Sequence, residues 1–229
     1  MKALILAGGR GTRLQTVVSN VPKPMAPVCG KPFLDILLKE LKKENVDSVI
    51  LSTGYMSEVI ESRYRNGFEG IPISFSRETT PLLTGGAIKK AISGLDSELI
   101  VVLNGDSFVR LDLDQISKFH QEKKADITIV SVYMKDASRY GLLKVSSDFR
   151  IEMFCEKQSN SQGLINAGVY VFNSDLLKSC TQLVFSFEEW LKNSLYKLDV
   201  YAFVSDDKFI DIGIPSDYEK AQDFFAEKR

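Results

Sequence analysis

Short apolar runs alternate with segments of helical periodicity over the first part of the chain. Five runs are short and rich in apolar residues, as expected for buried strands, and they cover residues 3–7, 48–52, 71–75, 98–103 and 126–132. Between them, apolar residues recur at helical spacing, which predicts helices at 32–44, 57–64, 86–93 and 113–123. This alternation predicts an α/β fold with a doubly wound, mostly parallel sheet of the Rossmann-like kind.

The pattern changes after residue 132. Strands with few helices between them are predicted at 142–145, 151–155 and 168–172. They indicate a small antiparallel subregion that extends the sheet and is a candidate lid. The remaining predicted elements are a helix, a strand and a closing helix, at 187–196, 200–204 and 215–227. No repeat, low-complexity tract or flexible linker interrupts the chain, so we expect a single domain over residues 1–229.

Composition and charge exclude several classes of function. The 29 basic and 30 acidic residues give a net charge of −1, so the chain has no overall positive charge that would attract nucleic acid or a membrane surface. The three cysteines, Cys29, Cys155 and Cys180, are far apart and form no C-x-x-C pair, which argues against a disulfide framework or a structural zinc site. The apolar start is too short for a signal peptide. We therefore expect a cytoplasmic protein with reduced thiols.

A glycine-rich loop directly follows the first predicted strand. Gly8, Gly9 and Gly11 allow backbone conformations that side chains would forbid, and consecutive amides in such a loop can bind an anion. In open α/β sheets, ligands bind beyond the carboxyl ends of the strands, which is where this loop lies. A dinucleotide fingerprint is excluded because Leu14 takes the place of its last glycine, and the chain contains no P-loop motif.

Two cationic residues follow this loop. Arg13 comes directly after it, and Lys23 lies in a segment with three prolines, Val21 to Pro27. Because proline fixes φ and removes a donor, we expect this segment to be stiff and extended, with Lys23 held in one direction. A solvated lysine in a proline-rich turn is the alternative.

Two aspartates follow apolar segments and are candidate metal ligands. Asp106 comes after the run 98–103, and Asp211 follows a shorter apolar stretch. Mg²⁺ commonly takes one or two carboxylates together with substrate phosphates. Each aspartate alone is equally compatible with a turn or a helix cap, so the residues themselves leave both interpretations open.

The glycine loop with Arg13 and Leu14, followed by Pro22-Lys23-Pro24-Met25, resembles the signature of the sugar-1-phosphate nucleotidyltransferases. The resemblance extends over nearly the whole chain. It implies an enzyme that joins a sugar 1-phosphate to the nucleotidyl group of a nucleoside triphosphate and releases pyrophosphate. It also implies a nucleotide-binding part at about 1–132 and a sugar-binding, closing part at about 133–229.

The resemblance implies roles for individual residues. Arg13 and Lys23 would be catalytic, and Asp106 and Asp211 would hold Mg²⁺. The nucleotide would be bound by Leu6, Ala7, Gly8, Gly9, Gly11, Thr12, Arg13, Lys23 and Gly85. The sugar phosphate would be bound by Tyr140, Gly141, Glu156, Lys157 and Asn166. From the residues alone, a surface ion pair is an equal explanation for Glu156 and Lys157, as a turn is for Asn166.

Two departures from the family pattern are visible. Gln158 follows Glu156 and Lys157 where the family has proline, which loosens that turn but keeps both charges. Leu83 stands where the family often has glycine, which leaves the details of the base pocket open. The only histidine, His120, is expected on an exposed helix face and is given no catalytic role.

Within the family, the segments 8–33, 51–55, 139–141 and 165–172 resemble the members that use GTP and a heptose 1-phosphate for surface-polysaccharide synthesis. Mannose 1-phosphate guanylyltransferases and the thymidylyl, uridylyl and cytidylyl relatives share most of these segments and remain alternatives. A non-catalytic subunit that binds sugar nucleotides is an alternative of another class, although such a protein is expected to lose Arg13, Lys23 or an aspartate. A homodimer is left open.

Overall fold

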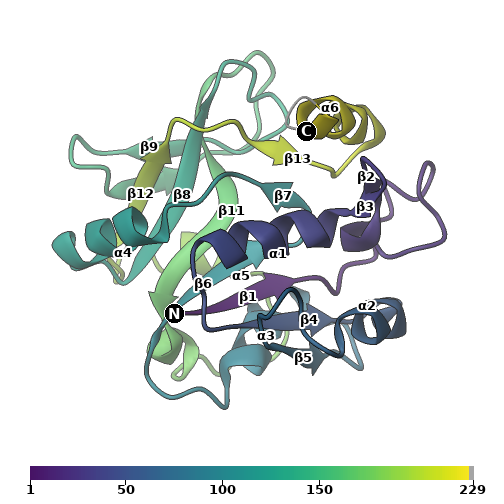
Figure 1. The fold of residues 1–229 in the computed structure, drawn as a ribbon. Helices are drawn as coiled ribbons and strands as arrows, with labels where there is room; N and C mark the ends of the chain where they lie inside the picture. The colour runs from purple at the N-terminus through teal and green to yellow at the C-terminus, as the bar shows by residue number, and fades with distance from the viewer. Residues whose placement is uncertain (227–229) are drawn as a thin grey trace.

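A seven-stranded sheet forms the centre of the computed structural model, which describes residues 1–226 (Figure 1). The strand order is β12-β8-β11-β6-β1-β4-β5. Their bounds are β1 Lys2–Leu6, β4 Ser48–Thr53, β5 Ile73–Arg77, β6 Leu99–Asn104, β8 Ile127–Met134, β11 Gly163–Asn173 and β12 Val200–Ser205. Strands from both sides of residue 132 therefore share one sheet.

Most neighbouring strands run parallel, as the sequence predicts. The pairs β1–β4, β1–β6, β4–β5 and β8–β12 are parallel, whereas β11 runs antiparallel to both β6 and β8. In β1, Ala3, Leu4 and Ile5 are each at most 1% exposed, because the strand is covered on both faces. This double burial explains why β1 is a continuous apolar run in the sequence.

Helices cover both faces of the sheet, which gives the three-layer arrangement of a doubly wound fold (Figure 1). Ala3 and Ile5 belong to the core under one set of helices: α1 Phe33–Lys43, α2 Ser57–Tyr64, α4 Leu113–Glu122 and α6 Pro215–Ala226. Leu4 points to the opposite core, under α3 Leu83–Ile92 and α5 Phe187–Lys192. Within residues 1–226, none of these helices is long and apolar enough to cross a membrane.

Small antiparallel pairs and short 3₁₀ turns complete the structure. β9 Leu143–Val145 pairs with β10 Ile151–Phe154, which confirms the predicted antiparallel subregion. The other elements are β2 Pro27–Val28 with β3 Lys31–Pro32, β7 Ser107–Phe108 with β13 Ile210–Asp211, and the 3₁₀ turns η1 Lys23–Met25 and η2 Ser174–Leu177.

The structure corrects the predicted bounds of several elements. The strand expected at 168–172 is part of β11, inside the main sheet and outside the β9–β10 subregion, because residues 169–172 are buried by both layers. The strand expected at 71–75 begins at Ile73, after Pro72, which has no amide hydrogen to donate. The helix expected at 187–196 ends at Lys192. Residue 227 of the predicted closing helix lies outside the described residues.

His120 is buried, so the expected exposed position on α4 is wrong. The residue is 8% exposed, and its Nδ1 atom lies 2.9 Å from Oγ1 of Thr128 on β8. Burial lowers the pKa of His120, while the negative charge of Asp126 opposes that change. The histidine is therefore held neutral in the core, where it links α4 to the sheet.

Because His120 has a lower pKa folded than unfolded, the unfolded chain binds its proton first as pH falls. We expect the free energy of unfolding to be unaffected by His120 above its ordinary pKa of 6.5 and to fall below it. The slope from this group is at most about 1.4 kcal/mol per pH unit. Urea denaturation between pH 7.5 and 5.5 measures it, and the His120→Gln variant should show a shallower dependence. An identical slope in both proteins would contradict this assignment.

Candidate active site

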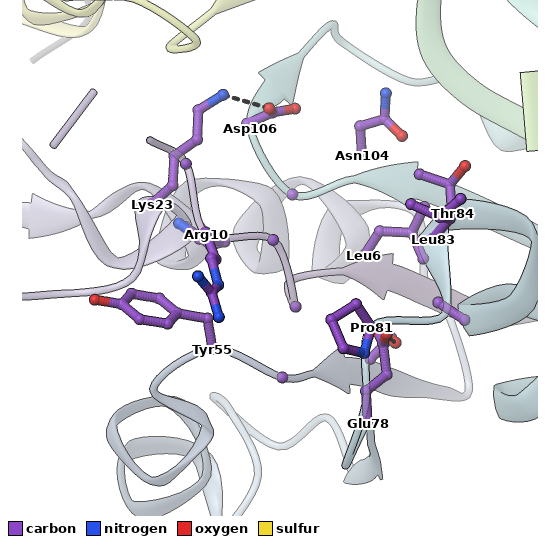
Figure 2. A pocket seen from close by; sticks show the side chains of 18 of the residues that line it. Leu6, Arg10, Lys23, Tyr55, Glu78, Pro81, Leu83, Thr84, Asn104 and Asp106 are labelled. Carbon is purple, nitrogen blue, oxygen red and sulfur yellow. Dashed lines mark hydrogen bonds and ion pairs between the residues drawn. The ribbon is translucent and has the colours of Figure 1, made fainter. Parts of the chain in front are cut away.

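An open cleft of about 700 Å³ lies at the carboxyl edge of the sheet (Figure 2). Leu6, Ser52 and Asn104 pair across β1, β4 and β6 in register, so these parallel strands end together there. The loops after them and the segment between β5 and α3 form the walls of the cleft. Eight of the predicted residues line it: Leu6, Gly8, Gly9, Gly11, Thr12, Arg13, Lys23 and Asp106.

The loops after β1 and β4 touch through two glycines. The amide of Tyr55 donates to the carbonyl of Gly8 at 3.1 Å. A Cβ atom on Gly8 would lie 2.7 Å from Oε1 of Glu78, and one on Gly54 would lie 2.9 Å from the Gly8 carbonyl. Position 54 therefore requires glycine for a close backbone approach, whereas a side chain at position 8 would press on the Glu78 carboxylate.

Gly11 makes room for Lys23. Gly11 has a φ of +59°, and a Cβ atom there would lie 2.7 Å from Cβ of Lys23. The aliphatic part of the lysine consequently packs on the glycine loop, and its side chain is only 10% exposed. The ammonium group forms an ion pair with the carboxylate of Asp106, drawn as a dashed line in Figure 2.

Lys23–Met25 form a 3₁₀ turn, so the expectation of an extended segment is wrong at Lys23 itself, although Pro22 is extended. The amide of Met25 donates to the Pro22 carbonyl at 2.7 Å, and that of Ala26 donates to the Lys23 carbonyl at 3.0 Å. Proline suits a first helical turn, because the backbone amides there have no partner within the helix and proline lacks an amide hydrogen. The prolines still restrict the backbone and hold Lys23 toward the cleft.

The two predicted metal ligands are brought together by a very short strand pair. Asp211 of β13 lies opposite Ser107 of β7, and the amide of Ile212 donates to the carbonyl of Asp106 at 2.9 Å. Burial raises the pKa of Asp211, and the neighbouring negative charge of Asp106 raises it further. The amide of Gly213 donates to Oδ1 of Asp211 at 2.6 Å and fixes its orientation.

This pair of carboxylates fits a divalent cation that is shared with a substrate. Among residues 1–226, no group of three or more His, Cys, Asp or Glu side chains is arranged to hold a metal ion by itself. Mg²⁺ commonly takes only one or two carboxylates and completes its shell with water and phosphate oxygens. Burial and the negative charge of Asp106 both raise the pKa of Asp211, and such a cation would offset the negative charge.

Tyr140 and Gly141 lie beside this pair, outside the lining of the cleft. The hydroxyl of Tyr140 donates to Oδ2 of Asp211 at 3.4 Å. A Cβ atom on Gly141 would lie 2.7 Å from the carbonyl of Cys155, so the chain at 140–142 packs closely on the chain at 155. The predicted sugar-side segments around residues 140 and 156 are therefore neighbours.

The other predicted sugar-side residues also lie outside the lining of the cleft. Glu156 is exposed and forms an ion pair with Lys192 of α5 at 2.7 Å, while Lys157 is exposed. Asn166 sits at a bulge in β11, where its Oδ1 accepts from the amide of Gly168 at 2.9 Å and its Nδ2 donates to the hydroxyl of Tyr170 at 2.8 Å.

Ala7 and Gly85 are buried behind the wall of the cleft. The amide of Ala7 donates to the Ser52 carbonyl at 2.8 Å. The amides of Gly85 and Gly86 both donate to the Phe185 carbonyl, at 2.9 and 3.3 Å. These first-turn amides of α3 therefore already have partners within the protein.

Glu78 and Asn104 also line the cleft but were not predicted from the sequence. Glu78 directly follows β5, and its Oε2 accepts from the amide of Leu82 at 2.9 Å. Asn104 ends β6, as a polar residue after an apolar run. Both could be recognised as polar side chains at the carboxyl end of a parallel strand. Glu78 was not recognised in this way because the strand before it was predicted two residues too early.

Comparisons with known proteins agree with this geometry. The family model described as nucleotidyl transferase matches residues 2–228. The chain is 46% identical to D-glycero-alpha-D-manno-heptose 1-phosphate guanylyltransferase of Aneurinibacillus thermoaerophilus, over 97% of both chains. It is 42% identical to the protein of the same name from Campylobacter jejuni, over 95% of this chain and 97% of that one.

A solved structure is similar as well. HddC from Yersinia pseudotuberculosis superposes with a TM-score of 0.88 and 36% identity, covering 98% of this chain and 99% of that one. The same protein complexed with GMP-PN superposes with a TM-score of 0.86. The family resemblance first seen in the glycine loop and around Lys23 thus extends over nearly the full length of the chain. The chain belongs to the nucleotidyl transferase family of enzymes.

Proposed function

We propose that this enzyme transfers GMP from GTP to D-glycero-α-D-manno-heptose 1-phosphate, giving GDP-heptose and pyrophosphate. The observation that carries the proposal is the single cleft that joins the glycine loop, Lys23 and Asp106 at one sheet edge. The names of the two relatives at 46% and 42% identity support the sugar, and the GMP-PN complex of HddC supports the guanine nucleotide. The triphosphate substrate favours a cytoplasmic location, and the product suits polysaccharide assembly.

The chemistry follows from the charges of the two substrates. An oxygen of the sugar phosphate attacks the α-phosphorus, a new P–O bond forms, and the bond to the β-phosphate breaks as pyrophosphate leaves. The attacking oxygen is already anionic, so no protein base is required. The main barrier is repulsion between two polyanions, and catalysis is chiefly positioning and charge neutralisation. Lys23 acts at the attacked phosphorus, and Arg13 contacts the triphosphate from the glycine loop.

We infer that Mg²⁺ is the cation held by Asp106 and Asp211. The adjacency of the two carboxylates and the burial of Asp211 support this inference. When bound there, the cation supplies positive charge to phosphate oxygens of both substrates. Lys23 lies at the same carboxylate, so its ammonium group and the cation would act on the same side of the cleft.

We also infer that Glu78 recognises the guanine edge. A carboxylate only accepts hydrogen bonds, and guanine presents adjacent donors at N1 and N2. Uracil and thymine present one donor between two carbonyl oxygens, which a carboxylate would repel. The backbone amide of Leu82 holds Glu78 in place, at the opposite end of the view in Figure 2 from Lys23 and Asp106.

A substrate panel tests the proposed function. Pyrophosphate release should be fastest with GTP and the heptose 1-phosphate, and slower with mannose or glucose 1-phosphate or with ATP, CTP, UTP or dTTP. EDTA should stop release, and excess Mg²⁺ should restore it. No release with any pair would instead indicate a non-catalytic protein that binds sugar nucleotides, while a faster pair would replace the proposed substrates.

Lys23→Ala should lower kcat by about 10²–10³-fold, because it removes the buried cation beside the reacting phosphates. Circular dichroism and thermal unfolding should show an intact fold. Lys31→Ala, at an exposed lysine outside the cleft, is the matched control and should retain wild-type turnover. A wild-type kcat for Lys23→Ala would refute the catalytic role.

Glu78→Gln should reduce the preference for guanine, because the glutamine side chain has a donor NH₂ group in place of one carboxylate oxygen. Its remaining oxygen can still accept a hydrogen bond from the backbone amide of Leu82. The ratio of kcat/KM for GTP to that for UTP is expected to fall about 10- to 100-fold, as for one or two buried hydrogen bonds. Glu58→Gln, at an exposed glutamate on α2, is the control. An unchanged ratio would show that the base is recognised elsewhere.

A further inference from the structure

Leu83, the first residue of α3, combines two unfavourable features. Its φ of +60° lies in the left-handed region, which favours glycine over residues with a Cβ atom. Its side chain is 55% exposed, although leucine is usually buried. Among the described residues, it is the one non-glycine residue with positive φ that lines the cleft.

The surrounding hydrogen bonds explain why the backbone cannot relax. The amide of Leu82 donates to Oε2 of Glu78 at 2.9 Å, and its carbonyl accepts from the amide of Phe185 at 3.2 Å. On the other side, the amides of Gly85 and Gly86 are both bonded to the Phe185 carbonyl. The chain must therefore enter α3 through a left-handed residue at position 83.

Glycine would satisfy this backbone requirement without strain, so the fold does not demand the leucine side chain. That side chain lines the same cleft as Pro81 and Leu6, which add further apolar surface. Figure 2 draws these residues and Glu78 apart from the charged pair of Lys23 and Asp106. The cleft thus has an apolar part around Leu83 and a charged part suited to phosphate.

We propose that Leu83 is a specificity-determining residue whose side chain packs against the face of the nucleoside base, next to the edge contacted by Glu78. The inference rests on the proposed use of GTP and adds an apolar contact to it. Base binding covers the exposed leucine, and a purine offers the larger flat surface. Leu83 therefore contributes to the affinity for the nucleoside and leaves the phosphate chemistry unchanged.

The test compares equilibrium binding of GTP and of inorganic tripolyphosphate by calorimetry, in wild type and in Leu83→Ala. The Kd for GTP should rise about five- to tenfold, as for exposing roughly half of a leucine side chain. The Kd for tripolyphosphate, which has no base, should stay unchanged. Leu183→Ala is the matched control, because Leu183 is 71% exposed but does not line the cleft.

Leu83→Gly separates the side chain from the backbone strain. It should weaken GTP binding as much as Leu83→Ala, while its Tm should equal or exceed that of Leu83→Ala, because glycine accepts the positive φ. Both variants should raise the KM for GTP, as expected when binding energy common to ground and transition states is lost.

Three outcomes would overturn the inference. If wild type prefers GTP to tripolyphosphate and Leu83→Ala leaves both Kd values unchanged, the role of Leu83 is wrong and the proposed function stands. If Leu83→Ala weakens both ligands equally, the leucine acts on the phosphate part of the cleft. If wild type binds GTP no more tightly than tripolyphosphate, both the base contact and the proposed use of GTP fail.

Discussion

The ion pair between Lys23 and Asp106 is the interaction on which the site depends. It joins residues 83 positions apart, one after the glycine loop and one after β6. The lysine reaches the aspartate because Gly11 has no side chain and the 3₁₀ turn directs Lys23 across the loop. Asp106 in turn is next to Asp211 through the β7–β13 pair. This one contact therefore connects the glycine loop, the ammonium group of Lys23 and the two neighbouring carboxylates.

The chain as a whole carries almost no net charge, so attraction of phosphate must come from placement. In the proposed mechanism, backbone amides of the glycine loop, two cationic side chains and a metal ion would together concentrate positive charge at the cleft.

The sequence predicted the sheet and the glycine-rich wall of the cleft because both depend on local patterns. Apolar runs mark strands, and the glycines beside Arg13 mark the loop. The opposite wall of the cleft was missed because it depends on tertiary packing: Glu78 is positioned by the amide of Leu82, and the predicted bounds of β5 were two residues too early. His120 was expected at the solvent because it is polar, but it lies on the buried face of α4 with Leu113 and Ile116 and contacts Thr128 of β8.

The meeting of Asp106 and Asp211 was expected from the family resemblance, but its cause lies in a two-residue strand pair too short to recognise in a sequence. The same holds for β11. Its residues have the pattern of a strand, yet nothing in that pattern indicates that it runs antiparallel between β6 and β8.

This position of β11 has a mechanical consequence. Backbone hydrogen bonds run without a break from β5, at one edge, through β11 to β12, at the other. The strands behind the glycine loop and those behind Asn166 therefore belong to one rigid plate, and rotating one half against the other would rupture a strand ladder. Enclosure of the substrates would then fall to a connecting segment at the rim, such as the β9–β10 hairpin, above a floor that stays fixed.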